Sequence, residues 1–191
     1  MTLVLHSKRL ALTPLHLDDI DLILEMFTDV EVMKYAGGKP MSEKAIREKM
    51  PTWIRRAGNG CIGVWCVSDR ETGEKYRTCA LLPMPVNEVD TDWDSLKEDA
   101  MPNDDIEIGY FLKRPAWHQG YATEASCRLL EFAFTDTPLL KVVATIDDEN
   151  ERSRHVLEKA GSIYQGRARA YAEENPIFCI DRTDWKRSVA N

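Results

Sequence analysis

The chain has 191 residues, of which 43% are hydrophobic and 30% are charged. This composition argues for one packed domain spanning residues 1–191 and against global disorder. The formal net charge of −7 argues against broad nucleic-acid binding, because phosphate contacts need clustered Lys and Arg.

Targeting, membrane and metal signals point to a cytoplasmic protein. No apolar run approaches the about 20 residues of a membrane-spanning helix, and residues 1–17 lack the apolar block of a secretory signal. The five cysteines are odd in number and form no CxxC pair, which disfavours disulfides and zinc. We expect no metal and no membrane or nucleic-acid partner, and a monomer or homodimer. Cysteines 61, 66, 79, 127 and 179 are interpreted as small buried residues.

The N-terminal half predicts strands and two amphipathic helices. Alternating leucines over 3–15, interrupted at 7–9, predict a strand with a turn or bulge. Helical spacing predicts a helix over 16–29, and after the break at 37–40 a second helix from Ser42, as N-cap, to about residue 56. Residues 61–68 and 75–82 are predicted strands joined by a hairpin turn at 71–73.

Residues 83–105 follow no regular pattern. They contain three prolines and eight acidic residues against one lysine, Lys97. We predict a long loop with a short helix over 93–99. Loops of this length are usually functional or disordered.

The C-terminal half is more regular. It predicts strands over 106–112, 139–146, 163–171 and 177–185, and helices over 120–134 and 150–160. A strand–helix–strand–helix centre with antiparallel flanks predicts an α/β fold of mixed α+β type, in which helices cover a mixed sheet.

One turn in this half has the form of an anion site. The strand over 106–112 leads through a short loop into His118-Gln119-Gly120-Tyr121-Ala122-Thr123, which opens a helix. Free N–H groups and the helix dipole at such a start favour a phosphate. The glycine spacing alone favours a turn that merely connects strand and helix, because it matches neither GxxxxGK[ST] nor GxGxxG.

The order of several short motifs resembles the GNAT superfamily of N-acetyltransferases, and more narrowly its RimJ/RimL-type branch. The motifs cover residues 106–110, 117–125 and 150–161, with supporting segments at 8–12, 29–33 and 63–67. The resemblance implies a GNAT-like fold: a splayed, mostly antiparallel mixed sheet of about seven strands, flanked by about four helices. It also implies direct transfer of an acetyl group from acetyl-CoA, as co-substrate, to a primary amine.

The resemblance assigns cofactor-binding positions residue by residue. The pyrophosphate turn falls on His118, Gln119, Gly120, Tyr121, Ala122 and Thr123. The strand that pairs with the pantetheine amides falls on Tyr110, Phe111 and Leu112, and the cofactor-side Asn on Asn150. Several positions depart from the family, among them His118, where Gly is common, and Ser162, where a Phe is usual. Two departures concern catalysis: Leu157 stands where many relatives have a Tyr that protonates the thiolate, and Thr145 where some have a catalytic Glu.

Glu107 and Ser153 remain as catalytic candidates. A carboxylate among apolar strand residues has a raised pKa and can act as a base, although Glu107 also fits a structural salt bridge or a solvated face. The resemblance implies that Ser153 lies near the thioester sulfur, whereas a serine at a helix start commonly bonds nearby backbone. His118 and His155 rank lower as bases.

Alternatives stay open for the function. One is a non-catalytic CoA-binding sensor or interaction protein on the same fold, and another is transfer of a longer acyl group. The acceptor is a protein N-terminus or a small amine. In a GNAT-like fold the acidic loop over 83–105 lies near the acceptor entrance, so it either attracts a cationic acceptor or only keeps the chain soluble.

Overall fold

The computed structural model describes residues 3–189, and its sheet has eight strands in the order β1-β2-β3-β4-β5-β6-β8-β7. The strands are β1 (Leu5–His6), β2 (Leu10–Pro14), β3 (Gly63–Asp69), β4 (Lys75–Pro83), β5 (Ile106–Leu112), β6 (Lys141–Thr145), β7 (Ile163–Ala170) and β8 (Glu173–Asp181). All neighbours are antiparallel except β5 and β6, which are parallel. The predicted mixed sheet is confirmed. It has one strand more than expected because the turn at residues 7–9 divides the first strand into β1 and β2.

Six α-helices and three short 3₁₀ segments flank the sheet in the described part of the chain. They are α1 (Ile20–Phe27), α2 (Val30–Met33), α3 (Glu43–Trp53), α4 (Tyr121–Thr135), α5 (Glu151–Lys159) and α6 (Arg182–Val189), with η1 (Leu17–Asp19), η2 (Trp93–Ser95) and η3 (Arg114–Ala116). Ser42 caps α3 as predicted, because its Oγ accepts the Ala45 N–H at 3.2 Å.

Two sequence predictions need correction, and one element was missed. The last strand, predicted over 177–185, begins at Glu173 and ends at Asp181, whose Oδ1 accepts the N–H groups of Thr183 and Asp184 at 2.8 and 2.9 Å. These bonds start α6, so Trp185 is helical. The helix predicted over 93–99 is the single turn η2, and the four-residue α2 was not predicted.

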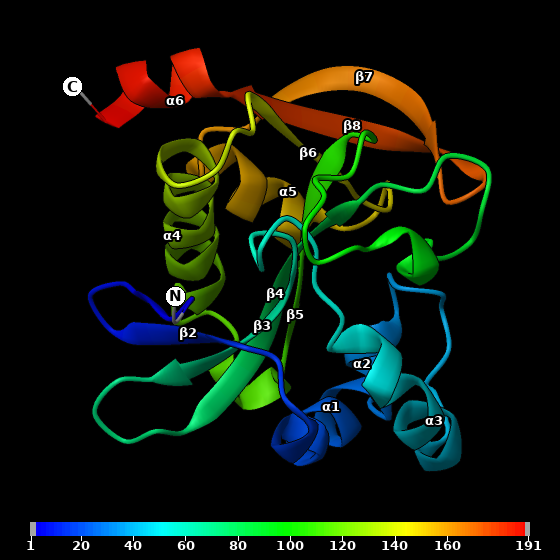
Figure 1. The fold of residues 1–191 in the computed structure, drawn as a ribbon. Coiled ribbons are helices and arrows are strands. Elements are labelled where there is room, and N and C mark those ends of the chain that lie inside the picture. The colour runs from blue at the N-terminus through cyan, green and yellow to red at the C-terminus, as the bar shows by residue number, and fades with distance from the viewer. Residues whose placement is uncertain (1–2, 190–191) are drawn as a thin grey trace.

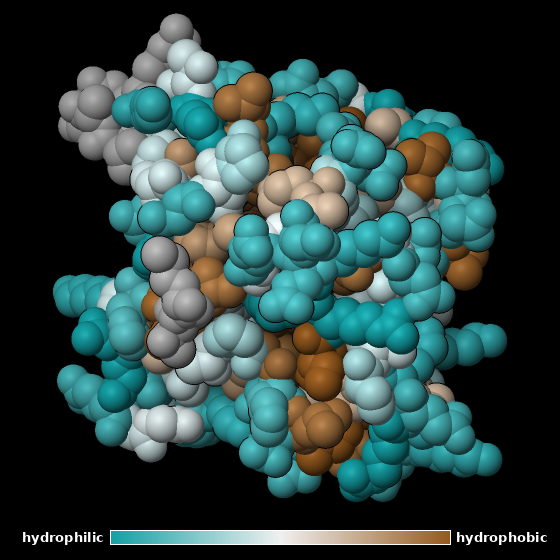
Figure 2. Space-filling view, viewed as in Figure 1, coloured by the Kyte–Doolittle hydropathy of each residue, from teal (hydrophilic) through white to brown (hydrophobic). Residues whose placement is uncertain are grey.

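The helices form two layers on opposite faces of the sheet (Figure 1). α4 and α5 pack on one face, around a core that includes Trp65, Leu129 and Phe178. α1 and α3 pack on the other face, around Ile23 and Ile46. Hydrophilic side chains cover most of the face in Figure 2, and a few hydrophobic residues reach the surface between them.

The sheet divides between its two parallel strands. β5 pairs with β4 over its whole length, from Ile106 opposite Pro83 to Leu112 opposite Arg77. Its register with β6 is one residue pair, Glu107 with Val143. Beyond Glu107 the second edge of β5 therefore has no strand partner among the described residues, which is the splay that the resemblance implies.

The cysteines only partly follow their interpretation as buried residues. All five are free, and Cys66 and Cys79 are buried. Cys61 and Cys179 are partly exposed, and Cys127 is exposed on α4, so it is not a packing residue.

Within residues 3–189, no helix combines the length and the apolar character needed to cross a bilayer. Over the same residues, no group of three or more His, Cys, Asp or Glu side chains is arranged to hold a metal ion.

Candidate active site

The turn before α4 is shaped by two residues with left-handed backbone. His118 has φ 62° and Gly120 has φ 78°. Gln119 holds the turn closed, because its Nε2 donates to the Pro115 carbonyl at 2.8 Å. Gly120 is the N-cap of α4 and has no side chain to accept a hydrogen bond from the first turn. The N–H groups that open a helix have no partner within it, so those of α4 are placed to bind an anion.

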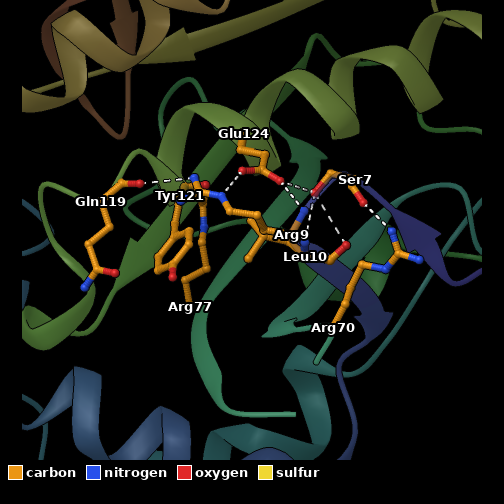
Figure 3. A network of polar contacts seen from close by, with 8 residues as sticks. All are labelled: Ser7, Arg9, Leu10, Arg70, Arg77, Gln119, Tyr121 and Glu124. Carbon is orange, nitrogen blue, oxygen red and sulfur yellow. Dashed lines mark hydrogen bonds and ion pairs between the residues drawn. The ribbon is translucent and has the colours of Figure 1, made fainter. Parts of the chain in front are cut away.

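Arg9, which precedes β2, fixes the orientation of this turn (Figure 3). Its Nε donates to Glu124 Oε2 at 2.7 Å, and its backbone N–H donates to Glu124 Oε1 at 2.7 Å. Its Nη2 donates to the Gln119 carbonyl at 3.1 Å. Burial acts to raise the pKa of Glu124, but the hydrogen bonds from Arg9 and Ser7 outweigh it and lower that pKa. Glu124 is therefore ionised and paired with Arg9.

A buried cation lies beneath the same turn. The Arg77 side chain is 0% exposed, and its Nη1 donates to the Tyr121 carbonyl at 2.9 Å. Its guanidinium lies 5.0 Å from the centre of the Tyr110 ring, and its buried Nη2 has no hydrogen-bond partner. Burial lowers the pKa of Arg77. No ion pair within residues 3–189 involves Arg77.

The three predicted pantetheine-binding residues lie on the unpaired length of β5. Tyr110, Phe111 and Leu112 are half-buried there and pair with β4 on one edge. The Tyr110 hydroxyl donates to the Ser153 carbonyl at 3.3 Å, on the side of α4 and α5. Phe111 points to the other side, where its ring centre is 4.7 Å from that of Phe27 in α1. The free backbone edge between these sides can pair with an extended amide chain.

Glu107 occupies the point where β5 and β6 part. Its residue is 7% exposed, and burial raises the pKa of its carboxyl to about 8, although a hydrogen bond with Thr145 acts to lower it. The hydroxyl of Tyr171, in the turn between β7 and β8, donates to Glu107 Oε1. Thr145, which stands where some relatives have a catalytic Glu, thus lies beside the carboxyl that this chain does have. A buried carboxyl with a pKa near 8 suits a proton-transfer role.

Ser153 and Asn150 lie on the opposite side of the sheet from Glu107. The Asn150 Oδ1 accepts the Ser153 N–H at 3.1 Å and caps α5, so Asn150 has a structural role whatever else it does. Leu157 is 1% exposed and packs in the core on the α4 side. The structure therefore brings Ser153 to Tyr110 and not to Glu107. His155 is exposed on α5, as expected of a helix exterior.

The acidic loop borders an open pocket on the α3 side. The pocket has a volume of about 420 Å³ and is lined by Lys49, Thr52, Trp53, Arg55 and residues 90–94. Lys49 pairs with Asp90 at 3.1 Å, and Arg55 pairs with Asp94. Part of the negative charge of the loop is therefore neutralised by cations of α3 and its C-terminal end, which the sequence reading did not anticipate.

Four polar residues of the site were missed by sequence reasoning: Arg9, Arg77, Glu124 and Tyr171. Arg9 and Glu124 are 115 positions apart, and Tyr171 and Glu107 are 64 apart. No local pattern connects such pairs. Of these four residues, Arg77 could have been singled out from the sequence, because it is a charged residue at an inward position of a predicted strand.

Comparison with known proteins places the chain among acetyltransferases. Residues 9–163 match the family model described as an acetyltransferase (GNAT) domain. An uncharacterized N-acetyltransferase, p20, of Bacillus licheniformis is 28% identical over 168 residues, which cover 87% of this chain and 86% of that protein. The FsC-acetyl coenzyme A-N(2)-transacetylase of Aspergillus fumigatus is 28% identical, over 96% of this chain and 78% of that protein. A GNAT-family acetyltransferase structure from Bacillus anthracis shares the fold, with a TM-score of 0.74 at 18% identity, covering 95% of this chain and 99% of that one.

Proposed function

The chain belongs to the GNAT family of acetyltransferases, and we propose that it transfers an acetyl group directly from acetyl-CoA to a primary amine. The donor is supported by the name of the Aspergillus fumigatus relative, which specifies acetyl coenzyme A. We propose further that residues 1–191 form one catalytic domain of the RimJ/RimL-type branch, on the motifs given above.

The free edge of β5, which ends beside the turn that opens α4, is the observation that carries this proposal. One extended molecule with a phosphate at one end and amides along its length fits both features. The turn over 118–123 would hold the pyrophosphate through N–H groups, with Arg77 as a buried countercharge. Tyr110, Phe111 and Leu112 would hold the pantetheine amides through their backbone, and Asn150 would contact the co-substrate from the start of α5.

Glu107 is the proposed general base. A primary amine has a pKa of roughly 8 to 10, depending on its type, so it arrives mostly protonated at neutral pH. Burial raises the pKa of Glu107 to about 8, which suits a base that takes a proton from an amine near neutral pH. Since it lies where β5 and β6 part, Glu107 would stand at the inner end of the proposed pantetheine path. Ser153, on the other side of that path, is proposed to contact the thioester sulfur.

The acceptor is proposed to enter over the face of α1 and α3. Glu107 and Phe111 point to this face, and the pocket beside α3 opens on it. The acidic residues of the loop over 83–105 favour a cationic amine, such as a polyamine or a basic peptide end. Asp90 and Asp94 attract a cation less strongly than two free carboxylates would, because they are already paired with Lys49 and Arg55.

The test is release of free CoA thiol from acetyl-CoA with a panel of amines, together with calorimetry of CoA binding. We expect CoA to bind and at least one amine to give turnover with an acetylated product. CoA binding without turnover on any amine class would favour the non-catalytic sensor, and a higher rate with a longer acyl-CoA would contradict acetyl as the transferred group. Absence of CoA binding would contradict the proposal altogether.

A further inference from the structure

Tyr171 is held firmly over the parting of the sheet. It begins the two-residue turn between β7 and β8, where Tyr171 and Ala172 have φ values of 55° and 63°. Its backbone N–H donates to the Pro85 carbonyl at 2.9 Å, and the N–H of Ala172 donates to the Val86 carbonyl at 3.1 Å. These two bonds anchor the backbone of the turn to residues 85–86, from where the half-buried Tyr171 side chain reaches Glu107.

The contact between Tyr171 and Glu107 is enclosed by apolar residues. Met84, Val143 and Ala170 form a small buried cluster, and Tyr171 packs against it. The Tyr171 hydroxyl donates to Glu107 Oε1, and Thr145 bonds the same carboxyl. Within residues 3–189 no cation pairs with this carboxyl. Its described partners are the hydroxyl groups of Tyr171 and Thr145, which carry a transferable proton and no fixed charge.

Acetyl transfer requires a proton donor that the family position does not supply. The leaving thiolate must be protonated, and Leu157 has no group that can do so. Ser153 has a hydroxyl, but its backbone is bonded to Asn150 and Tyr110 on the side away from Glu107. A donor must also regain its proton in each turnover, and no described contact connects Ser153 to the proposed base.

Building on the proposed function, we propose that Tyr171 is the general acid for the leaving thiolate and that Glu107 returns its proton. The amine reacts in its neutral form, after the protonated form has lost one proton to solvent. Its nitrogen attacks the thioester carbon and forms the N–C bond, while the carboxylate of Glu107 accepts one proton from that nitrogen. As the C–S bond breaks, the sulfur takes the electron pair of that bond and the proton of the Tyr171 hydroxyl. The phenolate then recovers a proton from Glu107 through their hydrogen bond. The products are the amide and free CoA thiol, and both residues end as they began.

Geometry supports this assignment because the sulfur is one bond from the carbon under attack. A base in hydrogen-bond reach of the amine is therefore close to the sulfur as well. Tyr171 already contacts that base. In the proposed arrangement its hydroxyl would therefore lie next to both the Glu107 carboxyl and the leaving sulfur. The relay needs no proton from solvent, which suits a carboxyl that is 7% exposed.

The experiment compares Y171F with wild type and with Y164F, a control at the exposed far end of β7. With acetyl-CoA we expect Y171F to lose about 10²-fold or more in kcat with little change in the KM of either substrate. With the selenoester analogue, whose selenolate leaves without a proton, Y171F should recover most of that loss, whereas E107Q should stay slow with both donors. Equal losses of Y171F with both donors, or no loss, would overturn the proposal.

A measurement without turnover separates this proposal from the proposed function. The thiol of CoA bound to each protein is titrated by its thiolate absorbance. A hydrogen-bond donor near the sulfur favours the thiolate, so the thiol pKa should be lower in wild type and Y164F than in Y171F. The same thiol pKa in all three proteins would reject Tyr171 as a donor, whether or not any amine is acetylated.

Discussion

Arg9 joins the start of β2 to the first turn of α4 through Glu124, with two hydrogen bonds of 2.7 Å to its two carboxylate oxygens. A third bond at 3.1 Å reaches the Gln119 carbonyl, so one side chain fixes both sides of the Gly120 position. Arg9, between β1 and β2, thus helps to orient the N–H groups that open α4. It stabilises the turn proposed to bind the pyrophosphate but is not proposed to contact the pyrophosphate itself.

Replacing Arg9 by Ala should therefore weaken CoA binding indirectly. The expected loss is about 1 kcal/mol in binding free energy, because the hydrogen bonds are charge-assisted but the side chain is partly exposed. Calorimetry of CoA binding tests this, with Glu131→Ala on the exposed face of α4 as the matched control. If Arg9→Ala binds CoA with the affinity of wild type, the turn keeps its shape without the Arg9 side chain.

Gly120→Asp should bind CoA poorly. A side chain is strained at φ 78°, but Asp and Asn are among the residues that adopt this left-handed backbone most readily. The carboxylate of the Asp would repel a pyrophosphate at the turn, so we expect CoA affinity to fall by at least about tenfold, or 1.4 kcal/mol. Gly120→Asn is the control, because it adds a side chain of similar size and similar backbone strain without the charge. Equal affinities for the two variants would remove the turn from the phosphate site.

The elements of the fold were predictable because their signals are local. Ser42 caps α3, and the alternation at Ile106 and Ile108 marks β5, as the sequence indicates. The end of β8 was missed because an apolar Trp185 continues the strand pattern, whereas the side chain of Asp181 stops it. The contact between Tyr171 and Glu107 was beyond sequence reasoning, since it depends on how the β7–β8 turn folds over the parted sheet.

Arg77→Met should separate apo stability from CoA binding. A buried cation without a carboxylate partner carries a desolvation cost, which Met removes while filling similar space. The cost of the lost bond to the Tyr121 carbonyl opposes this gain, so we expect a small change in the Tm of the free protein. The rise in Tm on adding CoA should shrink clearly, because the countercharge is gone. A full rise in Tm in Arg77→Met, measured by thermal shift, would contradict a role for Arg77 in phosphate binding.

Glu107 predicts a pH dependence of stability with a defined sign. Its pKa is about 8 in the folded chain and near 4.3 in an unfolded one, so the folded state holds a proton that the unfolded state loses. Stability should therefore fall as pH rises from about 4 to 8, by a few kcal/mol in the limit of full burial. Glu107→Gln abolishes this titration. Denaturant melts should show the free energy of unfolding of Glu107→Gln rising relative to that of wild type towards pH 9, with little difference at pH 4.

The kcat of wild type should rise from about pH 4 to 8, because the base acts when deprotonated.

The acidic loop gives the sharpest test of a cationic acceptor. Asp90 and Asp94 are paired with Lys49 and Arg55, so changing Asp90, Asp92 and Asp94 together to Asn removes three negative charges and leaves two cations unpaired. The acceptor KM should rise in this variant, whereas Lys49→Met with Arg55→Met should lower it by freeing the carboxylates. Salt should reduce both effects, since the Debye length is about 10 Å at 0.1 M.

The KM of acetyl-CoA should change little in either variant. Steady-state kinetics at two salt concentrations decides the matter: an anionic acceptor, or an acceptor KM that ignores both variants, would mean that the loop has no part in attracting the amine.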